Sequence, residues 1–268
     1  MRPKIGIALG GGAARGWSHI GVLRSLIAAG IEPDIIAGTS IGAVVGGCYV
    51  AERLDAVEDF ARSLTRRRVL GFLDFNLAGT GIISGQRLSE RLTTQLGDTT
   101  IEALPKPFTA VATEIGTGHE VWLSRGNLVE AIRASYAIPG IFRPVRINGS
   151  WLFDGAIVNP IPVSVCRALG ARYVIAVNLN SDLCGRGMVM SNVAAPAHEI
   201  EAPEPEGAAP KREGARWLLH RQLFGSGQAE ATPGISTVVY DAFNIVQDRI
   251  ARSRLAGDPP DAMINPRL

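Results

Sequence analysis

The sequence predicts an α/β fold in which helices cross over between the strands of a parallel sheet. Within the first 54 residues, two apolar runs of strand length alternate with two segments of helical periodicity. This alternation is typical of parallel strands joined by crossover helices. The continuous apolar run over residues 173–179 indicates a buried, central strand. Of the 268 residues, 46% are hydrophobic, which supplies apolar area for a sizeable core and excludes a wholly disordered chain.

Periodicity and glycines define the individual elements. The strand at residues 5–9 stops at three glycines, and apolar residues then recur at helical spacing from Trp17 to Ile27 until Gly30 stops the helix. We predict further strands at residues 34–37, 108–112, 120–123, 151–153 and 262–264, and helices at residues 41–54, 55–64, 86–96, 128–135 and 236–255.

Two segments have compositions that do not suit a core. Residues 69–85 mix apolar side chains with four glycines and predict a flap, directly after the basic run 66–68. Residues 195–214 contain four prolines and five acidic residues, so we expect them to be disordered. Residues 215–224 then predict a short amphipathic helix.

Charge and cysteine content limit the class of protein. The 27 Lys and Arg against 25 Asp and Glu give a net charge of +2, too balanced for a dedicated nucleic-acid binder. The three cysteines are too widely spaced for a disulfide framework or a zinc site, which indicates a reducing compartment. The N-terminal apolar run is too short for a signal peptide, and no run approaches the ~20 residues of a membrane span. We therefore expect a cytoplasmic protein with one domain over residues 1–268 and a disordered or lid-like insertion at about 181–234.

The motif Gly38-Thr39-Ser40-Ile41-Gly42 matches G-x-S-x-G between a predicted strand and a predicted helix. Such an elbow strains its central residue, and the flanking glycines let two backbones pass closely. Ser40 Oγ would then lie at a helix N-terminus, where developing negative charge is favoured. This context favours a nucleophile over an ordinary N-cap serine.

The glycine-rich loop at residues 10–16 also follows a strand and opens a helix. A dinucleotide fingerprint would need glycine where Arg15 stands and an acidic residue after the second strand. A P-loop would need lysine and Ser or Thr after the last glycine, but Trp17 follows Gly16. The remaining interpretation is a set of backbone N–H groups aimed at an oxyanion. Only this interpretation gives the loop at residues 10–16 and the motif at residues 38–42 roles in the same reaction.

Asp154 is the strongest candidate for a base, because an apolar strand delivers it and Gly155 permits close backbone approach. The alternative is a local turn, which an isolated Asp-Gly pair commonly forms. None of the histidines stands in a convincing triad position; they are His19, His119, His198 and His220.

Together, these motifs resemble the bacterial branch of the patatin-like phospholipase family. G-G-G-x-x-R-G, G-T-S-I-G and D-G-A occur in that order and at about the family's separations. The resemblance is strong over roughly residues 4–180 and weak over 235–265, and it implies a three-layer α/β/α sandwich around a mainly parallel sheet. The segment 195–214 is not part of the family's core pattern. The chain ends at Leu268, where relatives commonly continue.

The resemblance implies a serine esterase or phospholipase with a Ser–Asp catalytic dyad and no metal or organic cofactor. Ser40 matches the nucleophile and Asp154 the base, and Arg15 would anchor the loop or a substrate phosphate. The loop that would supply oxyanion donors contains Gly11, Gly12 and Ala13. The supporting motif residues are Gly10, Arg15, Gly16, Gly38, Gly42 and Gly155.

The expected partner is a lipid ester substrate, and the sequence leaves the oligomeric state open. The basic run, the flap and the helix at 215–224 are compatible with peripheral docking on the anionic inner membrane surface. The alternatives are that the three arginines form a solvated face, which is the more common role of such a run, and that Trp217 and Leu219 pack on the core. The alternative function is a catalytically weak or inactive regulatory or binding protein on the same scaffold. Intact Ser40, Asp154 and glycine loop argue against it.

Overall fold

The computed structural model describes residues 2–64, 86–181 and 235–266. The chain divides into one compact unit, Met1–Asp182 with Phe243–Leu268, and a second unit, Leu183–Ala242. Of the second unit, the structure describes only residues 235–242, which begin a helix. Several predicted segments lie outside the described residues: the basic run 66–68, the flap 69–85, the segment 195–214, the helix 215–224 and, apart from Ser181, the insertion 181–234.

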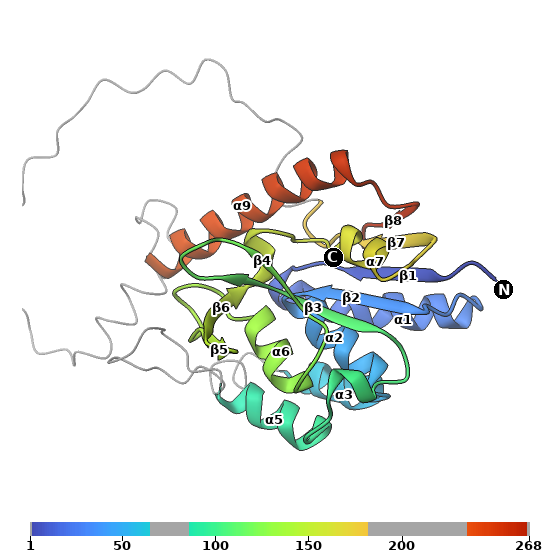
Figure 1. Ribbon diagram of the computed structural model, residues 1–268, viewed down its shortest axis with the longest axis horizontal. Coiled ribbons are helices and arrows are strands. Elements are labelled where there is room, and N and C mark those ends of the chain that lie inside the picture. Colours follow the sequence, from blue (N-terminus) through green and yellow to red (C-terminus); the bar gives the residue numbers. More distant parts are fainter. Residues whose placement is uncertain (1, 65–85, 182–234, 267–268) are drawn as a thin grey trace, which may run out of the picture. The chain divides into compact units, whose positions relative to one another are not determined.

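A mixed eight-stranded sheet forms the centre of the first unit (Figure 1). Its strands pair in the order β5-β6-β3-β2-β1-β7-β8, and β4 also pairs with β3. Among the described residues, β8, β7, β1, β2 and β3 are mutually parallel, whereas β4, β5 and β6 pair antiparallel. The strands are β1 (Ile5–Leu9), β2 (Ile35–Thr39), β3 (Phe108–Glu114), β4 (Glu120–Leu123), β5 (Val145–Ile147), β6 (Ser150–Asp154), β7 (Tyr173–Val177) and β8 (Ala262–Ile264).

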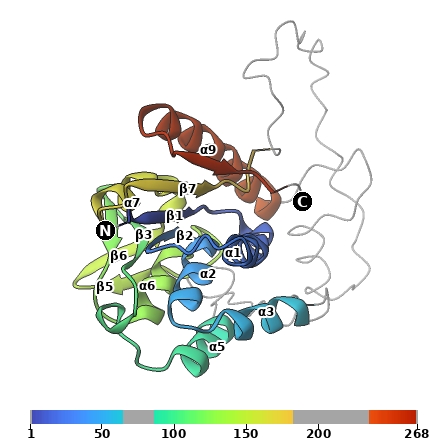
Figure 2. The same cartoon turned by 90° about the vertical axis from the view of Figure 1, so that its right-hand side faces the viewer.

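Helices cover both faces of this sheet, which confirms the predicted three-layer α/β/α sandwich (Figure 2). The larger core lies on one face and the smaller core, which includes Val165 and Ala251, on the other. The first face carries α1 (Ser18–Ala28), α2 (Ile41–Val50), α3 (Leu54–Ser63), α5 (Gln86–Leu96) and α6 (Leu128–Ser135); the second carries α7 (Val163–Ala168) and the Phe243–Gly257 part of α9 (Ile235–Gly257). Three short 3₁₀ helices are η1 (Ala13–Trp17), η2 (Ile101–Ala103) and η3 (Gly155–Ile157).

Two strands share one edge of β3. Val111 of β3 pairs with Thr39, the last residue of β2, and the next residue, Ala112, pairs with Asp154, the last residue of β6. Strand β4 pairs with both Val111 and Ala112 and therefore occupies the opposite edge. Since a strand has only two edges, β2 and β6 lie end to end along the same one. Their final residues meet at the middle of β3.

The predicted helix at residues 41–54 ends earlier than expected, whereas the predicted helix at 55–64 is present as α3. Helix α2 ends at Val50, and α3 begins at Leu54. Between them, Arg53 N–H donates to Cys48 O (2.8 Å) and Glu52 N–H donates to Tyr49 O (3.1 Å), which is a Schellman end. Glu52 adopts φ 59° there, where glycine is the usual residue. The prediction was wrong because no glycine marks this stop.

The predicted buried strand at residues 173–179 is confirmed in its burial, since Val174, Ala176 and Val177 are fully buried, but its position is not central. Strand β7 ends at Val177 and lies between β1 and the edge strand β8, and Tyr173 is half exposed. The central strands of the sheet are β1, β2 and β3. Strand β5 and helix α7 were not predicted, because three and six residues are too few to establish a period.

Candidate active site

Ser40 occupies a strained turn between β2 and α2. Its backbone adopts φ 56° and ψ −125°, a conformation that L-residues rarely take and that occurs preferentially at functional sites. Glycine is required at positions 38 and 42, because other backbone atoms lie too close to leave room for a Cβ. A Cβ on Gly42 would lie 2.1 Å from Leu9 O, and one on Gly38 would lie 2.5 Å from Gly42 O. The predicted elbow geometry is therefore present, with Ser40 directly before the first residue of α2.

The structure brings Ser40 and Asp154 together. Ser40 Oγ donates a hydrogen bond of 2.5 Å to Asp154 Oδ2, and Ala156 N–H donates one of 2.8 Å to Asp154 Oδ1. Ser40 is 4% exposed and Asp154 is fully buried. Burial raises the pKa of Asp154 to about 7, although both hydrogen bonds act in the opposite direction. A carboxyl with this pKa can accept and return a proton near neutral pH.

The glycine-rich loop lies beside Ser40. A Cβ built on Gly11 would lie 3.6 Å from Ser40 Cβ. Gly11 N–H, however, donates to Pro160 O (2.9 Å), and Gly10 N–H donates to Val177 O (3.1 Å). The structure assigns no acceptor among the described residues to the N–H groups of Gly12 and Ala13. These two groups, with Ala13 at φ 47°, are therefore candidates to donate to an oxyanion.

Arg15 contacts this loop and a side chain that the sequence did not identify. Its guanidinium donates to Asn180 Oδ1 (3.0 Å) and to Gly12 O (3.4 Å). Asn180 Nδ2 in turn donates to Gln247 Oε1 (3.3 Å) on α9. That same oxygen would lie 3.0 Å from a Cβ on Gly11. Asn180 and Gln247 are both buried. The hydrogen bonds from Arg15 through Asn180 to Gln247 therefore link the glycine loop to α9 in the protein interior.

Neither described histidine contacts Ser40 or Asp154. His19 is fully buried and its Nε2–H donates to Gly10 O (2.8 Å). Burial lowers the pKa of His19 to about 4 and outweighs the opposing effect of that hydrogen bond. His119 is exposed and lies 3.7 Å from Glu114. His198 and His220 lie outside the described residues.

Among the described residues, no group of three or more His, Cys, Asp or Glu side chains is arranged to bind a metal ion. Cys48 and Cys166 are free and buried, and burial raises the pKa of each thiol to about 12. Within the described ranges, no helix is both long enough and apolar enough to cross a membrane.

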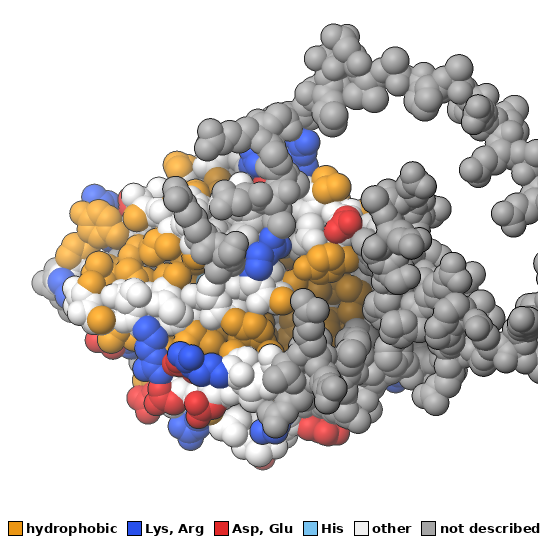
Figure 3. All heavy atoms as spheres, turned by 180° about the vertical axis from the view of Figure 1, so that it is seen from behind, with side chains coloured by type: hydrophobic (Ala, Val, Ile, Leu, Met, Phe, Trp, Pro, Cys, Tyr) orange, Lys and Arg blue, Asp and Glu red, His pale blue; other side chains and the backbone are white. Residues whose placement is uncertain are grey.

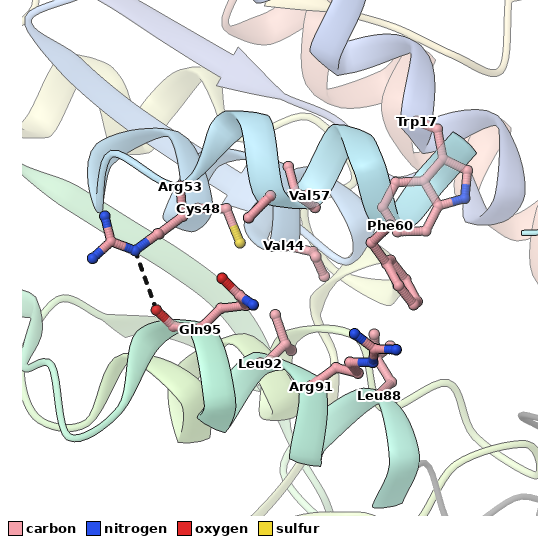
Figure 4. Close-up of a pocket in the computed structure, with 11 residues that line it drawn as sticks. Trp17, Val44, Cys48, Arg53, Val57, Phe60, Leu88, Arg91, Leu92 and Gln95 are labelled. Carbon is pink, nitrogen blue, oxygen red and sulfur yellow. Dashed lines mark hydrogen bonds between the residues drawn. The ribbon is translucent and has the colours of Figure 1, made fainter. Parts of the chain in front are cut away.

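A small cavity lies between α2, α3 and α5 (Figure 4). Its volume is about 40 Å³, which is room for a few water molecules at most and too little for an acyl chain. Ser40 and Asp154 are not among its lining residues, which are Trp17, Val44, Cys48, Arg53, Ala56, Val57, Phe60, Leu88, Arg91, Leu92 and Gln95. The cavity is therefore separate from the candidate active site.

Comparison with known proteins identifies the class. The profile of the patatin-like phospholipase family matches residues 7–167. The chain belongs to this family. It is similar to an NTE family protein of Mycobacterium tuberculosis, with 43% identity over 183 residues that cover 68% of this chain and 51% of the relative. It is also similar to human patatin-like phospholipase domain-containing protein 6, with 35% identity over 185 residues that cover 66% of this chain and 13% of the relative.

Further relatives extend the comparison. Lysophospholipase nte1 of Emericella nidulans is 32% identical over 182 residues, which cover 66% of this chain and 12% of that protein. The crystal structure of VipD from Legionella pneumophila shares the fold, with a TM-score of 0.51 and 14% identity over 69% of this chain and 51% of that one. The chain spans about half the length of the mycobacterial relatives that it matches.

Proposed function

We propose that this protein is a serine acyl hydrolase that cleaves lipid esters, with Ser40 as nucleophile and Asp154 as general base. The observation that carries the proposal is the 2.5 Å hydrogen bond from Ser40 Oγ to a buried carboxyl. The strained backbone of Ser40 and the pKa of about 7 at Asp154 support it.

In the acylation step, Asp154 Oδ2 takes the proton of Ser40 Oγ while that oxygen forms a bond to the ester carbonyl carbon. The negative charge moves to the carbonyl oxygen, where the N–H groups of Gly12 and Ala13 donate to it. The bond to the leaving alcohol then breaks, and the proton on Asp154 transfers to the alcohol oxygen. An acyl-enzyme on Ser40 results, and Asp154 is again ionised.

Water completes the cycle. Asp154 takes a proton from a water molecule, whose oxygen attacks the acyl carbonyl carbon. The bond between that carbon and Ser40 Oγ breaks, and Asp154 returns the proton to Oγ. The products are an alcohol and a carboxylic acid, and the protein is unchanged. Each step needs only groups that lie within or beside the Ser40–Asp154 pair.

The names of the relatives support lipids as the substrate class, since they include a phospholipase domain-containing protein and a lysophospholipase. We also propose peripheral contact with a lipid surface. On the face seen in Figure 3, hydrophobic side chains reach the surface between arginine and lysine side chains. Among the described residues, Trp122 and Trp151 are about half exposed, as is typical of residues at a lipid–water boundary.

A fluorophosphonate probe and a chromogenic ester test the proposal together. We expect wild-type protein to be labelled and to hydrolyse p-nitrophenyl butyrate. Ser40→Ala should lose both properties, because it removes the attacking oxygen. Ser25→Ala, at an exposed position of α1, is the matched control and should retain both. Wild-type turnover by Ser40→Ala would refute the proposal, and an unlabelled, inactive wild type would favour the regulatory alternative.

A further inference from the structure

The carbonyl group of Val111 lies at the point on β3 where the pairing with β2 ends and the pairing with β6 begins. Val111 is the last residue of β3 that pairs with β2, and Ala112 is where pairing with β6 begins. The chain after Asp154 passes directly over this point, since a Cβ on Gly155 would lie 2.3 Å from Val111 O. Val111 thus pairs with the residue before Ser40, and its carbonyl lies against the residue after Asp154.

Ser135, the last residue of α6, occupies this junction. Its Oγ donates to Val111 O (2.6 Å) and accepts from Ser40 N–H (2.9 Å). The side chain is fully buried, so water is excluded as a replacement for either partner. A serine hydroxyl is suited to this place because it donates and accepts at once.

The bond to Ser40 has two consequences for the elbow. It fixes the direction of the Ser40 peptide in a backbone conformation that is costly for an L-residue, and the direction of that peptide determines where Oγ points. It also satisfies Ser40 N–H, so this group is not one of the donors proposed for the oxyanion. A catalytic atom displaced by about 1 Å can lose on the order of 100-fold in rate.

We propose that Ser135 is a positioning residue for the hydrolysis, which holds the Ser40 elbow against β3 so that Oγ meets Asp154. The inference rests on the proposed function. Ser135 does not contact the reacting atoms and acts through Ser40 N–H. Its effect is therefore on the rate of attack rather than on substrate binding.

Ser135→Ala tests this role, and Ser135→Cys is a second variant that fills the space with a weaker donor and acceptor. The matched control is Thr109→Val on the same strand, β3, because Thr109 Oγ1 is buried and has no hydrogen-bond partner among the described residues. For each protein, kcat and KM on p-nitrophenyl butyrate and the rate of fluorophosphonate labelling are measured below its own melting temperature.

We expect Ser135→Ala to lower kcat and the labelling rate at least tenfold with KM changed less than threefold, Ser135→Cys to be intermediate, and Thr109→Val to match wild type. A folded Ser135→Ala with wild-type kcat would overturn the inference. So would failure of both Ser135 variants to fold while Thr109→Val folds, because Ser135 would then serve stability alone. An inactive, unlabelled wild type would instead refute the proposed function itself.

Discussion

The N–H of Gly11 donates a 2.9 Å hydrogen bond to the carbonyl of Pro160. This bond joins the glycine-rich loop to the segment that follows Asp154. The same segment is fixed to β2 through a second bond, from Thr39 Oγ1 to Asn159 O (2.8 Å). The proposed oxyanion loop and the segments that carry the proposed nucleophile and base are therefore joined by hydrogen bonds to backbone carbonyls. A displacement of any one of them would disturb the other two.

Asp154→Asn should lower kcat/KM by a factor on the order of 10³ or more, because the amide keeps the shape of the carboxylate but cannot accept the serine proton. His19→Gln and His119→Gln should each keep a large fraction of wild-type activity when folded, since neither imidazole contacts the pair. The measurement is kcat/KM on one chromogenic ester, with circular dichroism to verify folding. A histidine variant as inactive as Asp154→Asn would contradict the dyad.

The pH dependence of kcat/KM should follow the ionisation of Asp154. Because burial raises its pKa to about 7, the base is protonated and inactive in acid. We expect activity to fall about tenfold per pH unit well below this pKa and to reach a plateau above it. A pH–rate profile between pH 5 and 9 with an uncharged ester measures the midpoint. A flat profile down to pH 5 would show that Asp154 is not the titrating base.

Asp154→Asn should also stabilise the fold at neutral pH. The folded pKa lies above the unfolded value near 3.8, so the folded state binds more protons between pH 4 and 7. The free energy of unfolding of wild type therefore decreases over this interval, by on the order of 4 kcal/mol. The free energy of unfolding of Asp154→Asn does not decrease in this way, because the asparagine side chain does not ionise. Urea denaturation of both proteins at pH 5 and pH 8 measures the difference, and an equal gap at the two pH values would contradict the prediction.

Arg15→Ala should distinguish a loop anchor from a phosphate anchor. The contacts of Arg15 with Asn180 and Gly12 predict that its loss reduces kcat on a phosphate-bearing lipid and on an uncharged ester by the same factor, about tenfold. Arg62→Ala is the control, because Arg62 is exposed on α3 and pairs with Glu58. A selective loss on the phosphate-bearing substrate would assign Arg15 to substrate binding instead.

Gly42→Ala should abolish folding or destabilise it by several kcal/mol. Its Cβ would lie 2.1 Å from Leu9 O, and a backbone atom of a buried strand cannot move away. Gly21→Ala is the matched substitution within α1, where nothing lies within 4 Å of the new Cβ. It should stabilise the protein by about 0.5–1 kcal/mol through helix propensity. Melting temperatures of the two variants decide the comparison.

Sequence patterns predicted those strands and helices whose ends are determined by residues close by in the sequence. Strands β1 and β4 and helices α5 and α6 begin and end where glycine, proline and periodicity place them. The polar residues around the site were not predicted, because their roles arise only when distant segments meet. Ser135 lies on an ordinary amphipathic helix and Asn180 follows a strand, and nothing in the neighbouring sequence marks either as a partner of the glycine loop or the elbow.

In helix α9, the pattern of apolar and polar residues does not predict which side chains are buried. Its polar residues Asn244, Gln247 and Asp248 are buried, whereas Ile245 and Val246 are about half exposed. The usual rule for an amphipathic helix would orient it the other way round. Two of these buried polar side chains have specific partners: Asn180 for Gln247, and Arg252 for Asp248 (2.8 Å).

The end-to-end placement of β2 and β6 on β3 also determines the order in which the site is assembled. Ser40 is synthesised early, but the carboxyl that contacts it follows 114 residues later. A nascent chain that has not yet reached Ser150 contains the elbow and no acceptor for its proton. Contacts of such long range form late in folding. Under the proposed function, hydrolysis therefore requires that β6 has joined the sheet, and a proteolytic fragment lacking β6 is expected to be inactive even if its first strands are folded.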